Sequence, residues 1–488
     1  MTGVPYEMVV GLEVHVQLLT KTKIFCGCAT DFGAAPNSNT CPVCLGLPGA
    51  LPVLNRRAVE LAARAALALA CTLHARSIFA RKHYFYPDLP KGYQISQFDQ
   101  PIATQGRLAF ATGAARELRS VAITRVHMEE DAGKSVHDRY PNVSAIDLNR
   151  AGIPLIEIVS EPDIRSAPEA RDYLRELKLI LEYLEVSDAN MEEGSLRVDA
   201  NVSARPAGSS TFGTKTEIKN MNSFSAVERA LDAEFARQCA LLDRGERVIQ
   251  QTMLWDANRA EIRPARSKEE SHDYRYFPDP DLPPLVLTDA WIAEIAAAIP
   301  ELPGAKRERL RAAYALGPQD ADVLTADPAL AEYFEAVATA HRDGKAAASW
   351  VVGDVLAALN HDQTDITSFR VSPRDLAGLL DMVRDGKLSR NAAKQVFATM
   401  RATGENAATI ATREGLLQVS DDSALTSWID AVWLAHPAET ARLVAGEQKL
   451  LGVLVGLVMK ESKGRADPKR VNQLLASRAA TGGGGGGG

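Results

Sequence analysis

Apolar and polar residues alternate in several short segments of the first 293 residues, which is the pattern of half-buried β-strands. In one of them, leucine and valine fall on one face, while Glu13, His15 and Gln17 fall on the other. The segments that show this pattern are 12–18, 123–129, 155–161, 196–203 and 214–219. This part of the chain is therefore predicted to contain a sheet with one apolar and one polar face.

Helical repeats interrupt the strands and then replace them. Ala- and Leu-rich periodicity predicts two helices within the first region, at 55–73 and 167–183. A proline cluster around 279–284 ends that region, and from Trp291 the chain is Ala-rich and almost entirely helical. A second break lies at 403–406. The pattern predicts an α+β fold with these parts: a sheet-containing domain over 1–293, an all-helical domain over 294–404, a small helical tail over 405–478 and a disordered glycine tract over 479–488.

Composition narrows the function classes only a little. Hydrophobic residues make up 46% and charged residues 24% of the 488 residues, as in ordinary globular proteins. The net charge of −7 argues against a simple basic nucleic-acid coat protein but leaves room for a local nucleic-acid site. The apolar run 450–459 is far shorter than a membrane span, and the N-terminus shows no signal peptide. We therefore expect a soluble protein of the cytoplasm.

Four of the six cysteines lie within nineteen residues, in the spacing C-x-C, twelve residues, C-x-x-C: Cys26, Cys28, Cys41 and Cys44. Two such pairs supply the four thiolates of a tetrahedral structural zinc site. The alternative is a chance cluster of buried thiols. Cys71 and Cys239 lie in helical patterns and are expected in the core, so no cysteine is predicted to act as a nucleophile.

The polar faces of the predicted strands carry an unusual set of side chains. Carboxylates and histidines recur with Asn, Arg and Lys, notably Arg125, His127 and Glu129 on one strand and Arg197, Asp199 and Asn201 on another. Carboxylates with an imidazole suit Mg²⁺, and the cations would offset phosphate charge, as phosphoryl transfer requires. A solvated face of an antiparallel sheet is the competing interpretation. No Walker A, G-x-S-x-G or H-E-x-x-H sequence is present.

A basic segment lies near the end of the acidic chain. Between Lys449 and Arg478, seven Lys or Arg face two acids, a net charge of +5. The cations gather at the end of an apolar helical segment: Lys460, Lys463, Arg465, Lys469 and Arg470. They form either a solvated face or a contact to a nucleic-acid backbone.

Seven strings of residues resemble the B subunit of the tRNA-dependent amidotransferase family, in collinear order over 1–478. They are V-G-L-E-V-H (10–15), Y-F-Y-P-D-L-P-K (84–91), Y-Q-I-S-Q-F-D (93–99), H-M-E-E-D-A-G-K (127–134), E-E-G-S-L-R (192–197), K-N-M-N-S (219–223) and D-Y-R-Y-F-P (273–278). The resemblance implies an antiparallel-sheet cradle similar to glutamine synthetase, followed by a helical domain and a small helical tail.

The resemblance also implies an activity, in which Glu-tRNA(Gln) or Asp-tRNA(Asn) is converted to Gln-tRNA(Gln) or Asn-tRNA(Asn). ATP turns the tRNA-linked carboxylate into an acyl phosphate, and ammonia then displaces phosphate. The family works as a heterotrimer, in which an amidase (glutaminase) partner, the A subunit, and a small third partner, the C subunit, accompany this one, and ammonia arrives through a channel. Two rival hypotheses are an archaeal-type relative specific for Glu-tRNA(Gln), for whose inserted domain the chain has no room, and a non-catalytic tRNA-binding adaptor.

Site residues carry over by position. Glu13, His15, Glu130 and Glu157 match the metal-binding positions of the family, and Glu129 and Asp199 are expected nearby in the same role. The candidates for ATP or phosphate contact are Lys82, Lys91 and Arg197. The resemblance favours tRNA recognition by the basic tail, whereas zinc follows from the cysteine spacing alone. The expected cofactors are thus ATP, Mg²⁺ and Zn²⁺.

Overall fold

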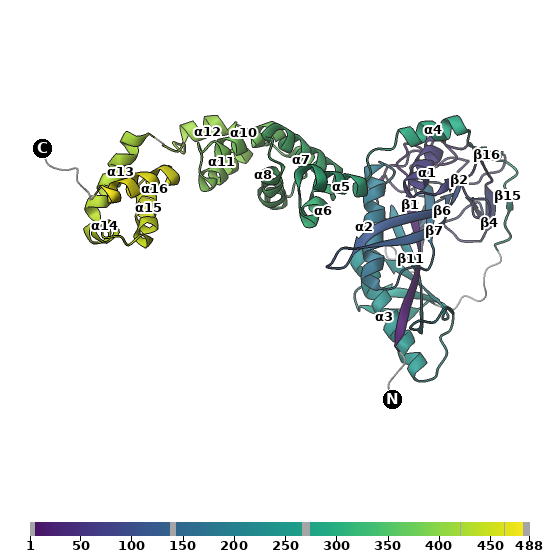
Figure 1. Ribbon diagram of the computed structural model, residues 1–488. Coiled ribbons are helices and arrows are strands. Elements are labelled where there is room, and N and C mark those ends of the chain that lie inside the picture. Colours follow the sequence, from purple (N-terminus) through teal and green to yellow (C-terminus); the bar gives the residue numbers. More distant parts are fainter. Residues whose placement is uncertain (1–4, 137–142, 266–273, 420, 463, 482–488) are drawn as a thin grey trace. The chain divides into compact units, whose positions relative to one another are not determined.

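The computed structural model describes residues 5–136, 143–265, 274–419, 421–462 and 464–481 (Figure 1). The chain divides into two compact units, Met1–Ala305 and Lys306–Gly488. None of the helices in these described ranges has the length and apolar character that crossing a membrane requires.

The first unit holds the sheets. Its strands are β1 (Tyr6–Gln17), β2 (Thr72–Leu73), β3 (Arg76–Ser77), β4 (Ala80–His83), β5 (Tyr93–Ser96), β6 (Ala103–Thr112), β7 (Glu117–Glu130), β8 (Lys134–Val136), β9 (Ala145–Asp147), β10 (Pro154–Ser160), β11 (Leu196–Pro206), β12 (Thr216–Met221), β13 (Thr252–Asp256), β14 (Glu261–Pro264), β15 (Phe277–Pro278) and β16 (Leu285–Val286). Its helices are α1 (Arg56–Ala68), α2 (Ala167–Tyr183), α3 (Phe224–Asp243) and α4 (Asp289–Ala297).

One 12-stranded sheet dominates this unit, with its main path in the order β14-β13-β12-β11-β1-β10-β7-β5-β4-β15. Neighbouring strands run antiparallel, as predicted, with one exception: β12 and β13 are parallel. Parallel neighbours need a crossover connection, and α3 supplies it between these two strands. The sheet is therefore mixed, and the prediction of a wholly antiparallel sheet was wrong at this edge.

Helix α3 was not predicted from the sequence. Its buried face mixes alanine and valine with the fully buried Glu234 and Gln238, so the apolar stripe is weak. The Gln238 amide donates to the Val202 carbonyl (3.2 Å), and its oxygen accepts from the Ala204 amide (2.9 Å). These bonds satisfy backbone groups of β11 where its pairing with β12 ends, so polar residues here serve packing that apolar periodicity does not reveal.

The other predicted elements agree closely with the structure. All five predicted strands correspond to observed ones, β1, β7, β10, β11 and β12, with ends that differ by at most two residues where the predicted range runs past the strand. The helix predicted at 167–183 is α2, capped by Ser166. The helix predicted at 55–73 ends at Ala68, because Ala70 takes a left-handed conformation (φ 52°) before β2 begins. Figure 1 shows α2 and α3 lying along the sheet, and α1, α2 and α3 share one core with its apolar face.

Strand register aligns the polar face. On β1, Leu12, Val14 and Val16 are buried in the core, which leaves Glu13 and His15 on the opposite face. His15 pairs with Arg197 of β11 on one side and with Glu157 of β10 on the other. Glu157 in turn pairs with His127 of β7, so one row of polar residues crosses four strands.

The second unit is helical. Its elements are α5 (Pro303–Tyr314, which begins in the first unit), α6 (Pro318–Thr325), α7 (Pro328–His341), α8 (Gly344–Trp350), a π-helical turn (Val351–Val355), α9 (Leu356–Asp362), a 3-10 turn (Ile366–Ser368), α10 (Pro373–Arg384), α11 (Arg390–Thr403), α12 (Ala407–Arg413), α13 (Asp422–Ala435), α14 (Pro437–Val444), α15 (Lys449–Glu461) and α16 (Pro468–Ala480).

Two hydrophobic cores lie within this unit, one from Leu310 to Ala411 and one from Leu425 to Leu475. Helix α12 contributes to the first core, which therefore continues past residue 404. The domain boundary at 404 stays a prediction. Near the other predicted boundary, the Arg56 guanidinium of α1 lies 5.0 Å from the Trp291 ring centroid. Residues 479 and 480 belong to α16 rather than to a disordered tract, and 482–488 lie outside the described residues.

The Gln238 bonds predict a stability effect. Gln238→Leu should lower the free energy of unfolding by about 2 kcal/mol, because the Ala204 amide would be left buried without an acceptor. Denaturant unfolding measures the change. As a matched control, Asp232→Leu on the exposed side of α3 should change it by less than about 0.5 kcal/mol. Equal effects of the two substitutions would contradict the role given to Gln238.

Candidate active site and metal-ligating clusters

Two carboxylates and two imidazoles converge on the polar face of the sheet. Glu157 Oε2 lies 3.3 Å from His15 Nε2 and 3.4 Å from His127 Nε2. Glu129 reaches the same two rings, each at 3.8 Å. Of these groups, one ligand atom each from His15, Glu129 and Glu157 lie within 4.8 Å of one another. This donor set is compatible with a divalent cation that prefers oxygen ligands.

Burial makes this cluster costly without a partner. His127 and Glu129 are almost fully buried, yet both ring nitrogens of His127 and Glu129 Oε2 have no hydrogen-bond partner. Burial alone would raise the pKa of Glu157, but the hydrogen bond from His15 and the charge of His127 hold it well below its usual range. Burial likewise opposes the charged form of His15, whose pKa is nevertheless raised by Glu157 and Glu129. Glu157 thus stays ionised although it is buried, because the two imidazoles stabilise its negative charge.

Glu13 and Asp199 face each other one row further along the same face. Glu13 accepts from the Asn201 amide (3.0 Å), and Asp199 accepts from Lys219 (2.7 Å). Burial, followed by the negative charges of Glu157, Glu217 and Asp199, raises the pKa of Glu13. Glu13 is therefore close enough to feel the negative charge of Glu157 in the buried cluster, while one of its own oxygens accepts a hydrogen bond from Asn201.

Glu130 lies apart from the cluster, although the resemblance placed it among the metal ligands. It follows Glu129 on β7, and neighbouring side chains of a strand point to opposite faces. Its Oε1 is ion-paired with Lys91 and accepts from the Ile95 amide (2.9 Å). The structure thus brings Glu129, rather than Glu130, next to His15 and Glu157.

The three predicted phosphate-binding cations are engaged differently. Lys91 pairs with Glu130, and Arg197 donates to Asp131 (3.0 Å). The Lys82 ammonium lies 4.9 Å from the Tyr274 ring centroid and 5.9 Å from that of Tyr84. Lys82 is the one of the three that is held by aromatic rings rather than by a carboxylate.

Sequence reasoning left three residues of this face without a role. Phe98 stacks on Tyr276 with ring centroids 5.2 Å apart, and it meets His127 edge-on at 6.1 Å. The Arg125 guanidinium lies 4.4 Å from the Phe98 centroid. The alternation of Arg125, His127 and Glu129 was visible in the sequence, but Phe98 and Tyr276 come from distant loops. Only their presence in the strings 93–99 and 273–278 pointed to them.

The four clustered cysteines form a second donor set. Their sulfurs lie within 4.8 Å of one another, with Cys41 Sγ and Cys44 Sγ 3.9 Å apart. Zinc–sulfur bonds of about 2.3 Å in a tetrahedron place sulfurs roughly 3.8 Å apart, so the spacing fits. The Cys41 amide donates to Cys44 Sγ (3.1 Å), which stabilises a thiolate.

Electrostatics around these sulfurs favour a thiolate at Cys44. The hydrogen bond from Cys26, together with Lys23, lowers the pKa of Cys44 to about 4. Lys23 is fully buried, and its ammonium donates to the carbonyls of Asn39 (2.7 Å) and Leu148 (3.2 Å). A cavity of about 90 Å³ is lined by Cys26 and Cys44 and also by Lys91 and Glu130. Away from the cluster, burial raises the pKa of Cys71 to about 12, as expected for a core thiol.

The basic tail residues are only partly available. Arg470 is ion-paired with Asp422, with its Nε 2.7 Å from the carboxylate, and the Arg465 guanidinium lies 5.6 Å from the Trp428 ring. Lys460 lies in the last turn of α15 and Lys469 in the first turn of α16. Lys463 lies outside the described residues.

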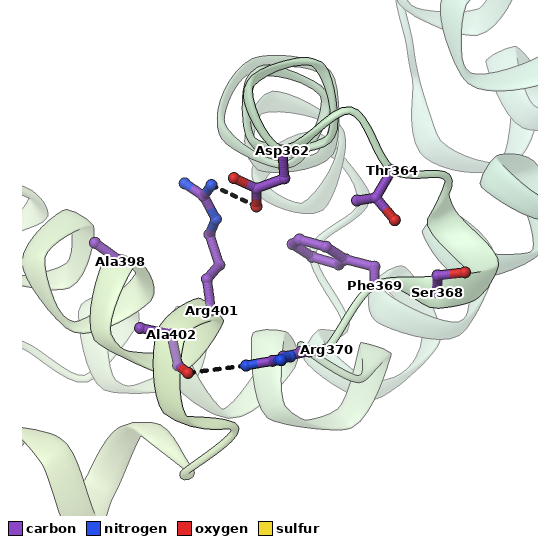
Figure 2. Close-up of a pocket in the computed structure, with 8 residues that line it drawn as sticks. All are labelled: Asp362, Thr364, Ser368, Phe369, Arg370, Ala398, Arg401 and Ala402. Atoms are coloured by element: carbon purple, nitrogen blue, oxygen red, sulfur yellow. Dashed lines mark hydrogen bonds and ion pairs between the residues drawn. The ribbon is translucent and has the colours of Figure 1, made fainter.

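A separate cavity of about 490 Å³ lies in the helical unit (Figure 2). Arg401 crosses it to pair with Asp362 (2.7 Å), and Arg370 donates to the Ala402 carbonyl (3.0 Å). Phe369 points into it between them. Because its arginines are already paired and none of the predicted site residues lines it, this cavity is not the candidate active site.

Comparison with known proteins identifies the family to which the chain belongs. Residues 8–293 match the family model of the GatB/GatE catalytic domain, and residues 332–478 match the GatB domain. The matched catalytic domain contains the carboxylate–imidazole cluster and the four cysteines. The fold and site thus define the catalytic component of an amidotransferase.

Several relatives align over nearly their whole length, and each is named as the B subunit of aspartyl/glutamyl-tRNA(Asn/Gln) amidotransferase. That of Myxococcus xanthus is 50% identical over 470 residues, covering 96% of this chain and 98% of the relative. Those of Geobacter sulfurreducens and Trichlorobacter lovleyi are each 52% identical, covering 96% and 97% of this chain and 98% and 99% of the relative. The chain belongs to the family of aspartyl/glutamyl-tRNA(Asn/Gln) amidotransferase B subunits, which confirms the resemblance seen in the sequence.

Proposed function

We propose that this protein catalyses ATP-dependent amidation of misacylated Glu-tRNA(Gln), Asp-tRNA(Asn) or both. The observation that carries the proposal is the buried group of His15, Glu129 and Glu157 within the matched catalytic domain. A tRNA-binding adaptor has no need for two carboxylates buried against two imidazoles, which is expensive unless they hold a ligand.

In the proposed reaction, the tRNA-linked carboxylate attacks the γ-phosphorus of ATP, and the bond to the bridging oxygen breaks. The resulting acyl phosphate is then attacked by ammonia, which releases phosphate and leaves the amide. Mg²⁺ bound to the protein supplies positive charge where the phosphoryl group carries negative charge. His15, Glu129 and Glu157 are the residues proposed to hold it, since their donor atoms already converge and Glu129 Oε2 is unpartnered.

The remaining predicted residues take positions around this centre. Glu13 and Asp199 add negative charge beside it, and Glu130 is proposed to act through its ion pair with Lys91. Lys82, Lys91 and Arg197 remain proposed contacts for ATP or phosphate. Lys91 and Arg197 would have to release a carboxylate before binding a phosphate, whereas the described contacts of Lys82 are with aromatic rings.

Ammonia is proposed to come from a separate polypeptide. Glutamine hydrolysis needs an activated nucleophile such as a Cys–His pair or a Ser–Ser–Lys set. In this chain four cysteines cluster together, and burial raises the pKa of both Cys71 and Cys239, which disfavours their thiolates. We therefore infer a heterotrimer in which this chain is joined by an amidase (glutaminase) partner, the A subunit, and a small third partner, the C subunit.

The division of labour between the polypeptides gives the central test. In the reconstituted complex, Glu157→Gln should lower amidated-tRNA formation by about 100-fold or more with either glutamine or ammonium, because phosphoryl transfer precedes any use of ammonia. Destroying the nucleophile of the amidase partner should remove only the glutamine-driven activity. Glu161→Gln, a matched change just beyond the end of β10, should leave both activities intact.

The outcome is read as amidated tRNA formed with each nitrogen donor, alongside thermal unfolding of every variant. Full ammonium-driven activity in a folded Glu157→Gln complex would refute the assignment of this cluster. Tight tRNA binding with no tRNA-dependent ATP hydrolysis in the native complex would favour the adaptor instead.

Zinc is proposed at Cys26, Cys28, Cys41 and Cys44, on the convergence of their sulfurs. The purified protein should carry about one zinc per chain, and Cys41→Ser should lower both zinc content and melting temperature, because structural zinc contributes folding free energy. Cys239→Ser, outside the cluster, serves as the control. Metal analysis that finds no zinc in protein prepared without chelators would end this proposal.

The basic tail is proposed to bind the tRNA backbone. Changing Lys460 and Lys469 together to Gln should weaken tRNA affinity and reduce its salt dependence by a slope of about 2, one for each phosphate interaction removed. Arg413 and Arg442, which are ion-paired with Glu405 and Glu447, provide a control pair with the same change in charge. Binding curves at several salt concentrations make the comparison. If the two double substitutions changed tRNA affinity equally, the tail would be a solvated basic face and not a tRNA-binding site.

A further inference from the structure

Most cations described on or beside the polar face are already neutralised by a nearby carboxylate. Lys219 pairs with both Asp199 (2.7 Å) and Glu217 (3.0 Å), and its pKa is raised by them against the effect of burial. Lys91 and Arg197 are held in the same way by Glu130 and Asp131. To bind a phosphate, each of these cations would first have to weaken an existing ion pair.

Arg125 differs from them. Its nearest carboxylate oxygen, Glu157 Oε1, lies 4.0 Å away, which is beyond hydrogen-bond distance. Its Nε is buried and has no hydrogen-bond partner among the residues that the structure describes. A buried guanidinium nitrogen without a partner is rare, because leaving it unsatisfied costs free energy. The side chain is nevertheless 22% exposed, so part of it is open to a ligand.

The surroundings fix the guanidinium in place. It lies 4.4 Å from the centre of the Phe98 ring, and Phe98 is itself stacked on Tyr276 at an interplanar angle of 15°. Arg125 is also two residues before His127 on β7, so both side chains lie on the polar face. An aromatic ring therefore holds the cation next to the carboxylate cluster while its polar donors remain unused.

We propose that Arg125 is a further catalytic residue that binds the phosphoryl group transferred from ATP to the tRNA-linked carboxylate. This inference rests on the proposed function and assigns one contact within it. A guanidinium offers a planar fork of donors that can bind two phosphate oxygens at once. A cation that is partly shielded from water also stabilises a nearby phosphate charge more strongly than a fully solvated one does. His15, Glu129 and Glu157 would hold Mg²⁺ close to this group, and Arg125, whose guanidinium lies 4.0 Å from Glu157, would donate to its oxygens.

The role is electrostatic and moves no proton. The attacking carboxylate oxygen forms a bond to the γ-phosphorus, and the bond to the bridging oxygen breaks, so that ADP leaves with the electron pair. Arg125 stays protonated throughout and donates to the equatorial oxygens, which carry the charge. It should therefore favour ATP over ADP, since only ATP carries the transferred group.

The test compares nucleotide affinity in the assembled complex. Arg125→Met should weaken ATP binding by roughly 10- to 100-fold while ADP binding changes less than about twofold, because the substitution removes a charge-assisted hydrogen bond to the γ-phosphate. Ammonium-driven turnover should fall by about 100-fold or more. Arg125→Lys keeps the charge but not the fork, and should recover part of the ATP affinity.

Arg119→Met is the matched control, because Arg119 lies on the same strand, is paired with Glu117 and is 55% exposed. Mn²⁺ binding to each variant, measured without nucleotide, reports whether the carboxylate cluster is intact. Equal behaviour of the two Met variants would overturn the proposal. So would a parallel loss of ATP, ADP and Mn²⁺ binding, which would show that Arg125 only positions the cluster. Absence of ATP-dependent amidation by the native complex is a separate result, which counts against the proposed function itself.

Discussion

The burial of carboxylates on and beside the polar face of the sheet is the constraint on which the site depends. Glu129, Glu130, Asp131 and Glu157 are all buried. A buried carboxylate without a partner would become protonated or destabilise the fold, so each must be matched by a cation or a ligand. Lys91 and Arg197 match two of them, and the imidazoles of His15 and His127 surround the other two. Strand register thus determines which cation or imidazole lies next to each buried carboxylate.

Strand register also explains what the sequence could and could not predict. Alternation along single strands correctly placed Glu13 and His15 opposite the core, because a period of two needs no knowledge of neighbouring strands. It could not determine which strands are adjacent, and the row from Arg197 to His127 exists only because β1 lies between β10 and β11. Family resemblance supplied most of the site, but it could not distinguish the environments of Glu129 and Glu130, which differ by one residue and therefore by one face.

Helix α3 and the parallel strand pair beside it were missed because of polar groups that are buried for structural reasons. Helix α3 was missed because Glu234 and Gln238 replace apolar residues on its buried face. The parallel pair β12–β13 was missed with it, since α3 is the crossover that makes that pairing possible. Phe98 and Tyr276 belong to loops, where no periodicity predicts which side chains meet. Hydrophobic patterning thus missed α3, which buries hydrogen bonds, and it also missed β6, although Leu108 and Phe110 of that strand are buried.

The cysteine cluster connects to the site through packing as well as through chemistry. Gly46, just after Cys44, has a positive φ of 66°, and a Cβ added there would lie 2.4 Å from Lys91 Cγ and 3.1 Å from its Cα. Only glycine lets this turn approach Lys91 so closely, and Lys91 is the partner of Glu130. Lys23 links the same turn to the Leu148 carbonyl before β10. A metal ion that fixed the four sulfurs would therefore also fix the backbone on which the Lys91–Glu130 ion pair rests, and Glu130 is one residue along β7 from Glu129 of the carboxylate–imidazole cluster.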